Sequence, residues 1–199
     1  MEKICDSYST GALYDFVSRS ENLEEYRNIL ESLADQKQNW TYIINDIMKE
    51  RGLSASKMAE LCGVSRQSVQ KWLKGSVPKS RETYIKIGFA AHYNLKQMNY
   101  FLQRYGCVNK LYPKYLEDSV CIFVLSSDCI EHSYQACEKV INMIKNEIFD
   151  DVPRSEGKEY TTSALELDIT NLRSLQEMVS FVKEHAQMYK QKYYRLYRY

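Results

Sequence analysis

The sequence predicts an all-helical protein. Only 7 of its 199 residues are Gly and 3 are Pro, so few residues interrupt regular secondary structure. Apolar residues recur at three- and four-residue intervals along most of the chain, which is the spacing of one helix face. With 44% hydrophobic residues, the chain can also bury a substantial core. We therefore expect an all-α fold in three parts: a helical extension at 1–39, a helical domain at 40–106, and a C-terminal helical domain at 107–199.

The N-terminal extension is expected to contain one or two helices, at 9–18 and 22–37. Apolar residues repeat at helical spacing in both stretches, while the remaining residues are mostly polar or acidic. An acidic exposed face favours a role in packing or in binding a protein partner. A further helix is expected at 40–50, where Ile43, Ile44, Ile47 and Met48 form an apolar face.

The segment 54–75 carries the clearest local pattern in the chain. Ser54 is placed to cap a helix at 55–62, whose apolar face contains Met58, Ala59 and Leu61. Gly63 follows where the chain must turn, Val64 is expected to point inward, and Ser65 can cap a second helix that begins at Arg66. The pattern therefore predicts two helices joined by a turn of about three residues.

The second of these helices has one apolar and one polar side. At about 100° per residue, Val69, Trp72 and Leu73 share one side, and the opposite side is polar. Gly75 then ends the helix with a residue that tolerates positive φ. The polar side contains the residue types that pair with base edges in the major groove of DNA, which are Arg66, Gln67, Gln70, Lys71 and Lys74.

These residues resemble the lambda-repressor-like family of DNA-binding domains, also called the Cro or XRE type, over about 40–105. The shared pattern comprises Gly52-Leu53-Ser54, Met58-Ala59, Gly63-Val64-Ser65, Val69 with Trp72, Lys74-Gly75-x-x-Pro78, and a following helix at 81–93. The resemblance implies a domain of five helices whose third helix enters the major groove. The fifth would begin after Asn94 and end at Gly106.

The resemblance also implies which side chains contact DNA. By position, the base-reading candidates are Arg66, Gln67 and Lys71, with Gln70 as an addition. Ala55 occupies a place that is often Gln, a residue that braces a phosphate, so Ser56 or Lys57 could take over that contact. The complete set of candidate phosphate contacts is Ser54, Ser56, Lys57, Ser65 and Lys74.

The charge distribution independently favours a polyanionic partner. The chain as a whole has a formal net charge of +1, yet residues 40–114 contain 13 Lys and Arg against 4 Asp and Glu, a net of +9. The flanking segments, 1–39 and 115–199, each have a net charge of −4. Because neutralising phosphates supplies most non-specific affinity for DNA, the basic middle of the chain agrees with the resemblance.

The C-terminal part is expected to be helical as well. The apolar run 120–125 could form a strand, but no second clear strand can pair with it, so a buried helix is favoured. A second helix is expected at 131–149, followed by a loop or hinge at 150–160. A long helix at 174–197 would end the chain, and its basic, Tyr-rich end is interpreted as packed and solvated rather than as a binding site for single-stranded nucleic acid.

Other classes of function have weaker support. No phosphate-binding Gly-rich loop or catalytic motif is present, so we expect no enzyme, no catalytic residue and no cofactor. None of the six cysteines forms a CxxC pair, and Cys121, Cys129 and Cys137 recur every eight residues, a spacing unusual for zinc ligands. Buried free thiols are therefore favoured for the six cysteines over a metal or redox site. No apolar run is long enough to cross a membrane and no signal peptide is evident, which predicts a cytoplasmic protein.

The leading hypothesis is a bacterial or phage transcriptional regulator, favoured as a repressor, that binds double-stranded DNA as a homodimer. One alternative is a protein-interaction module, such as an antitoxin or phage-defence adaptor, that holds a protein partner through its acidic flanking helices. Another is an unrecognised enzyme or effector domain in the C-terminal half.

Overall fold

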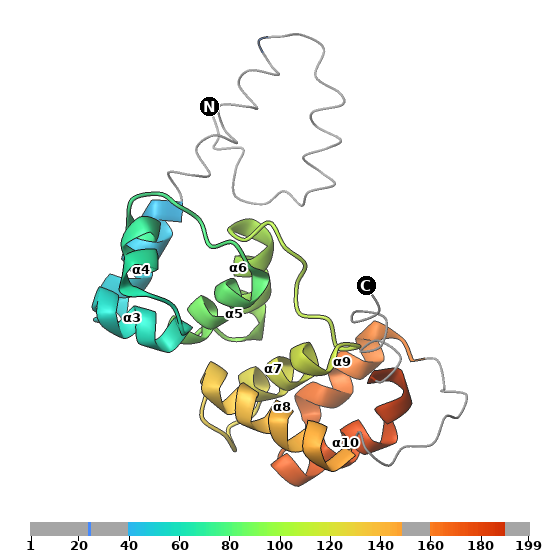
Figure 1. Cartoon of the computed structure of the whole chain (residues 1–199). Coiled ribbons are helices and arrows are strands. Elements are labelled where there is room, and N and C mark those ends of the chain that lie inside the picture. The colour runs from blue at the N-terminus through green and yellow to red at the C-terminus, as the bar shows by residue number, and fades with distance from the viewer. Residues whose placement is uncertain (1–23, 25–39, 149–159, 190–199) are drawn as a thin grey trace, which may run out of the picture.

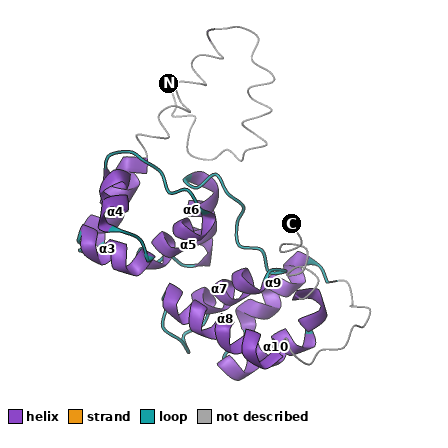
Figure 2. Cartoon of the chain, in the orientation of Figure 1, coloured by secondary structure: helices purple, strands orange, loops and turns teal. Residues whose placement is uncertain are grey.

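The computed structural model describes residue 24 and residues 40–148 and 160–189 (Figure 1). In these residues every regular element is a helix and none is a strand (Figure 2), which confirms the all-α prediction. The helices predicted at 9–18 and 22–37 lie outside the described residues, apart from helical Glu24. Most of the predicted loop at 150–160 and the basic end of the chain at 190–199 also lie outside them.

The first part of the described chain contains five helices. They are a helix at 40–50, α3 (Ala55–Cys62), α4 (Arg66–Leu73), α5 (Arg81–Ala90) and α6 (Leu95–Arg104). Each of the last four begins with a polar cap whose side chain accepts a hydrogen bond from the backbone N–H three residues on, and the caps are Ser54, Ser65, Ser80 and Asn94. These caps satisfy amides that the helices themselves leave unpaired, and they fix where each helix begins. The number and order of these helices match the expectation from the sequence.

One boundary in this part was predicted wrongly. The fourth helix of the expected domain was placed at 81–93, but α5 ends at Ala90. His92 adopts a left-handed conformation, with φ of 55°, and its backbone N–H donates to the carbonyl of Phe89. A residue in this conformation cannot continue a right-handed helix, so the chain turns there and Asn94 begins α6.

The second part contains four labelled helices, α7 (Leu116–Ser126), α8 (Tyr134–Ile148), α9 (Thr162–Asn171) and α10 (Leu175–Glu184). The apolar run 120–125 lies in α7 and is buried throughout, which confirms the buried helix. The predicted start of the next helix at Glu131 was wrong by three residues, because the Ser133 hydroxyl accepts from the Ala136 N–H at 3.1 Å and the helix begins after it. No helix was expected at 162–171, where α9 lies.

The predicted long helix at 174–197 is interrupted. α10 ends at Glu184, His185 forms a turn, and helical structure resumes at 186–189. The imidazole of His185 stacks on Phe181 with ring centroids 4.2 Å apart, and its Nδ1 lies 2.8 Å from the Phe181 carbonyl oxygen. The ring also lies against Tyr160, at 4.4 Å between centroids. The His185 side chain therefore contacts the last turn of α10, at the point where the helix ends.

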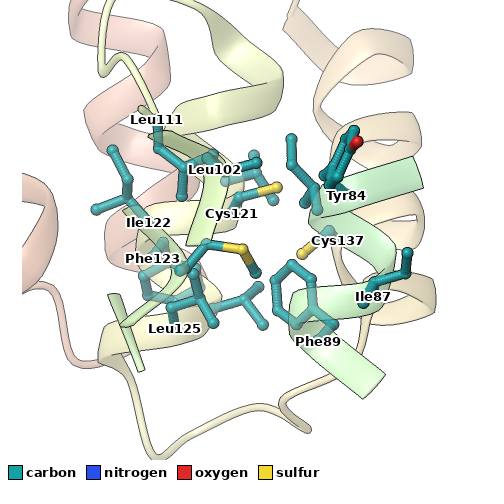
Figure 3. Packing of buried hydrophobic residues seen from close by; sticks show 14 of the residues in the cluster. Tyr84, Ile87, Phe89, Leu102, Leu111, Cys121, Ile122, Phe123, Leu125 and Cys137 are labelled. Atoms are coloured by element: carbon teal, nitrogen blue, oxygen red, sulfur yellow. The ribbon is translucent and has the colours of Figure 1, made fainter. Parts of the chain in front are cut away.

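A single hydrophobic cluster extends through both parts. It runs from Trp40 at the start of the described chain to Tyr189 at its end. Figure 3 shows the region where the two parts meet, with Tyr84, Ile87 and Phe89 of α5 facing residues of α7 and Cys137 of α8. α7 packs against α6, α8 and α9 and is the central helix of the second part. Among the described residues, no helix has both the length and the apolar character needed to cross a membrane.

Candidate nucleic-acid interface

The turn between α3 and α4 has the geometry that its sequence requires. Gly63 adopts a φ of 61°, and its N–H donates to the Glu60 carbonyl at 3.2 Å. The next N–H, from Val64, donates to the Ala59 carbonyl at 3.0 Å, and the Val64 side chain packs against the core. Ser65 then caps α4 through the Ser68 N–H at 3.2 Å. The two helices are thus joined by three residues whose backbone is held by hydrogen bonds.

α4 has a docked side and an open side, as predicted. Val69 and Trp72 are 0% and 5% exposed, so they fix the helix on the body of the domain. The four predicted base-contacting residues are all exposed, and they are Arg66, Gln67, Gln70 and Lys71. After α4, Gly75 adopts a φ of 97° and the Ser76 N–H donates back to the Lys71 carbonyl at 2.9 Å, which ends the helix sharply.

The candidate phosphate contacts also lie on the surface. Ser54, Ser56, Lys57, Ser65 and Lys74 are all exposed. The hydroxyl oxygens of Ser54 and Ser65 both accept capping hydrogen bonds. The Ser65 hydroxyl also lies 3.0 Å from the Ser68 hydroxyl, with which it can form a second hydrogen bond. Lys57 forms an ion pair with Glu60 at 2.8 Å, and because both side chains are more than half exposed this pair is weak enough to exchange for another anion.

Two basic residues of the middle segment are committed to internal contacts. The Lys86 ammonium lies 2.7 Å from Glu82 and 4.8 Å from the centre of the Tyr134 ring, where it joins α5 to α8. The Arg81 guanidinium binds both carboxylate oxygens of Asp118, at 2.9 and 2.8 Å. In the sequence, both cations were counted in the basic segment expected to attract a polyanion. In the structure, they bind residues at the junction between the two parts. No sequence pattern indicated these contacts.

The described cysteines do not form one class. Cys62, Cys121 and Cys137 are buried free thiols, as predicted, whereas Cys107 and Cys129 are exposed and correct the expectation of burial. Cys129 lies in the loop between α7 and α8, where the Ser127 hydroxyl lies 2.9 Å from its sulfur. Hydrogen bonding with Cys137 and burial both raise the pKa of the Cys121 thiol well above its usual value. Within the described ranges, no group of three or more His, Cys, Asp or Glu side chains is placed to bind a metal ion.

Comparison with known proteins identifies this arrangement. A family model described as helix-turn-helix matches residues 44–87, a stretch that contains most of the helix at 40–50, all of α3 and α4, and most of α5. A search of curated proteins and a search of solved structures each returned no match. The matched segment includes the sequence pattern of two helices and a turn, the capping residues Ser54 and Ser65, and the buried side of α4. Residues 44–87 therefore form a helix-turn-helix of the lambda-repressor-like type.

Proposed function

We propose that the protein is a sequence-specific regulator of transcription that binds double-stranded DNA, with α4 as the helix that reads the major groove. The observation that carries this proposal is the exposure of Arg66, Gln67, Gln70 and Lys71 on a helix whose opposite side is buried. A helix held in this way offers its polar side chains from a fixed position. That position is what base recognition requires, because a hydrogen bond to a base edge depends on geometry.

The side chains of α4 suit particular bases. Gln67 and Gln70 can each donate to and accept from adenine, and Arg66 and Lys71 can donate to the O6 and N7 atoms of guanine. A well-formed contact of this kind discriminates against the wrong base by about 1–3 kcal/mol. The exposed hydroxyls and lysines around α4 would bind phosphates, which set the register of the helix in the groove but carry no sequence information. α4 itself contains no acidic residue that would oppose the approach of DNA.

We also propose that the protein binds DNA as a homodimer. One helix-turn-helix contacts a short stretch of the groove, and dimers of such domains read two half-sites about 34 Å apart. The selected DNA should then be a palindrome, or nearly so, and the complex should contain two protein chains. Light scattering of the protein–DNA complex measures this stoichiometry directly, and a complex with one chain on a non-repeated sequence would contradict the dimer.

The test of the proposed function uses three substitutions on the open side of α4. Arg66→Ala, Gln67→Ala and Lys71→Ala each remove a proposed contact without touching the buried side, so the fold should be kept. Against a duplex selected by the wild-type protein, each should weaken binding by about 1–3 kcal/mol, or roughly 5- to 150-fold. Fluorescence anisotropy titrations provide the affinities, and circular dichroism checks the fold.

Matched control substitutions keep the residue type and change the location. Arg173→Ala, Gln176→Ala and Lys183→Ala alter exposed residues at or within α10, far along the chain from α4. These controls should bind the selected duplex like the wild type. Equal binding by all six variants would rule out α4 as the reading helix. If a stable protein complex instead covered α4 and excluded DNA, the protein-interaction module would become the better explanation.

A further inference from the structure

We propose that Lys110, in the linker after α6, binds a DNA phosphate that flanks the base pairs read by α4, together with Lys79 before α5. This inference rests on the proposed function and extends its interface to a residue outside the matched segment 44–87. Both lysines are exposed. The linker would then serve both as a connection between the two parts and as a second element of the DNA-binding surface.

The backbone around Lys110 is held in place by side chains from two helices. From the start of α5, Arg81 donates through Nε to the Asn109 carbonyl and through Nη2 to the Lys110 carbonyl, both at 3.0 Å. From α6, the Asn99 side chain accepts from the Leu111 N–H at 2.9 Å. The Leu111 side chain is fully buried. Lys110 is therefore an exposed cation on a fixed stretch of backbone, which reduces the entropy lost when it binds a partner.

The same hydrogen bonds tie the backbone at Lys110 to Arg81, which follows Lys79 by two residues. Figure 1 shows the loop that connects α4 to α5 and the linker that leaves α6. Lys79 and Ser80 precede α5 in that loop, and Arg81, the first residue of α5, binds the linker through the Asn109 and Lys110 carbonyls. Two exposed cations that are distant in sequence are thus both connected to the start of α5, Lys79 through the chain and Lys110 through Arg81. The loop that carries Lys79 is continuous with the end of α4, and the inference requires a DNA backbone that passes this end to continue to the start of α5.

Asp118, which Arg81 contacts, and Glu82, in the first turn of α5, are each paired with a cation. Asp118 is bound by Arg81, and Glu82 is bound by Lys86 at 2.7 Å. Between Glu82 and Glu117 the sequence contains no Asp or Glu at all. Neither Lys79 nor Lys110 forms an ion pair within the described part of the chain. Their positive charge therefore remains available, and a phosphodiester backbone is the partner that it fits.

The inference is tested by the salt dependence of DNA binding. Wild-type protein, Lys110→Gln, Lys79→Gln and the double variant are titrated with the selected duplex at several salt concentrations. Losing one phosphate contact should reduce the slope of log K against log salt by about 1, and losing both should reduce it by about 2. Both substitutions are on the surface, so circular dichroism should show an unchanged fold. Lys183→Gln, an exposed lysine in the last turn of α10, is the matched control and should leave the slope unchanged.

Ethylation interference then locates the contact on the DNA. For wild-type protein, ethylating a phosphate outside the base pairs read by α4 should block binding, and in Lys110→Gln this interference should disappear. If Lys110→Gln has the slope and interference pattern of the wild type, the inference is overturned while the proposed function stands. If the wild-type protein selects no duplex at all, the proposed function fails and this inference fails with it.

Discussion

At the scale of single residues, burial divides the described cysteines into two chemical classes. Cys62, Cys121 and Cys137 are buried, and Cys107 and Cys129 are exposed. Burial raises the pKa of Cys62 to about 12, an effect that the charge of Lys86 only partly offsets. Because the thiolate is the reactive form, a thiol with this pKa is almost entirely unreactive at pH 8, and burial also keeps the reagent away from it.

We therefore expect selective labelling of the native protein. A maleimide at pH 8 should modify Cys107 and Cys129 rapidly and should modify Cys62, Cys121 and Cys137 only after denaturation. Mass spectrometry of peptides taken at increasing times assigns a rate to each cysteine. Labelling of any of the buried three at the rate of Cys129 would show that the thiol is accessible and would contradict its burial, which Figure 3 shows for Cys121 and Cys137.

Residue patterns predicted which side chains of α4 are exposed, but they did not predict which side chains contact one another across the fold. The spacing of Val69 and Trp72 correctly placed the polar residues of α4 on the open side, because a helix has a fixed angular period. The same reasoning could not show that Arg81 binds Asp118, since the two residues are joined only by the tertiary fold. Burial was expected for Cys129 because free Cys usually behaves as a small core residue, but Cys129 lies in the loop between α7 and α8 and is exposed.

At the scale of elements, substitutions in the two turns that end α3 and α5 are expected to change the free energy of unfolding in opposite directions. Gly63 has a φ of 61°, and a Cβ there would meet only the Lys86 Nζ at 3.7 Å, so Gly63→Ala would be strained by its backbone rather than by a clash. His92 has a φ of 55° with a side chain already present. Gly63→Ala should therefore lower the free energy of unfolding by about 1 kcal/mol, and His92→Gly should raise it by up to about 1 kcal/mol.

Urea denaturation followed by circular dichroism measures both changes. Gly52→Ala is a useful comparison, because Gly52 has the same φ of 61° and nothing within 4 Å of an added Cβ. It should cost about as much as Gly63→Ala. A stabilising effect of Gly63→Ala, or a destabilising effect of His92→Gly, would mean that the backbone at these turns differs from the one described here.

Helix existence was easier to predict than helix ends. Capping residues and a glycine marked both ends of α3 and the start of α4 to the residue, because those signals act within three or four positions. α9 gave a weaker signal, since only Leu165 and Ile169 of its ten residues are buried and the charged stretch before it indicated a loop. The break at His185 depends on rings from Phe181 and Tyr160, and Tyr160 is too distant in sequence for helical periodicity to include it.

At the scale of the whole molecule, the ion pair of Arg81 and Asp118 connects the helix-turn-helix part to α7. The Asp118 side chain is 5% exposed and that of Arg81 is 31% exposed, so the carboxylate depends on its partner more than the guanidinium does. Asp118 also accepts from the Tyr112 N–H at 2.8 Å, in the linker. The division of the chain into domains at residue 106 stays a prediction. The ion pair joins a residue before this position to a residue after it.

The asymmetry of exposure predicts unequal costs for the two single substitutions. Arg81→Gln leaves a buried carboxylate without its cation and should cost about 2–3 kcal/mol of unfolding free energy, whereas Asp118→Asn leaves a cation that water can reach and should cost about 1 kcal/mol. The double variant should cost less than the sum of the two single variants. Chemical denaturation of the four proteins measures this cycle, and additive costs would show that the pair does not stabilise the junction.

The central claim is that α4 reads base sequence, and the most direct measurement is the ratio of affinities for the selected duplex and for a scrambled duplex of equal length and salt concentration. The wild-type protein should prefer the selected duplex strongly. Gln67→Ala should reduce this ratio by lowering affinity for the selected duplex alone, while Lys183→Ala should leave it unchanged. If Gln67→Ala, Arg66→Ala and Lys71→Ala all preserve the wild-type ratio, α4 does not read the bases and the account is wrong.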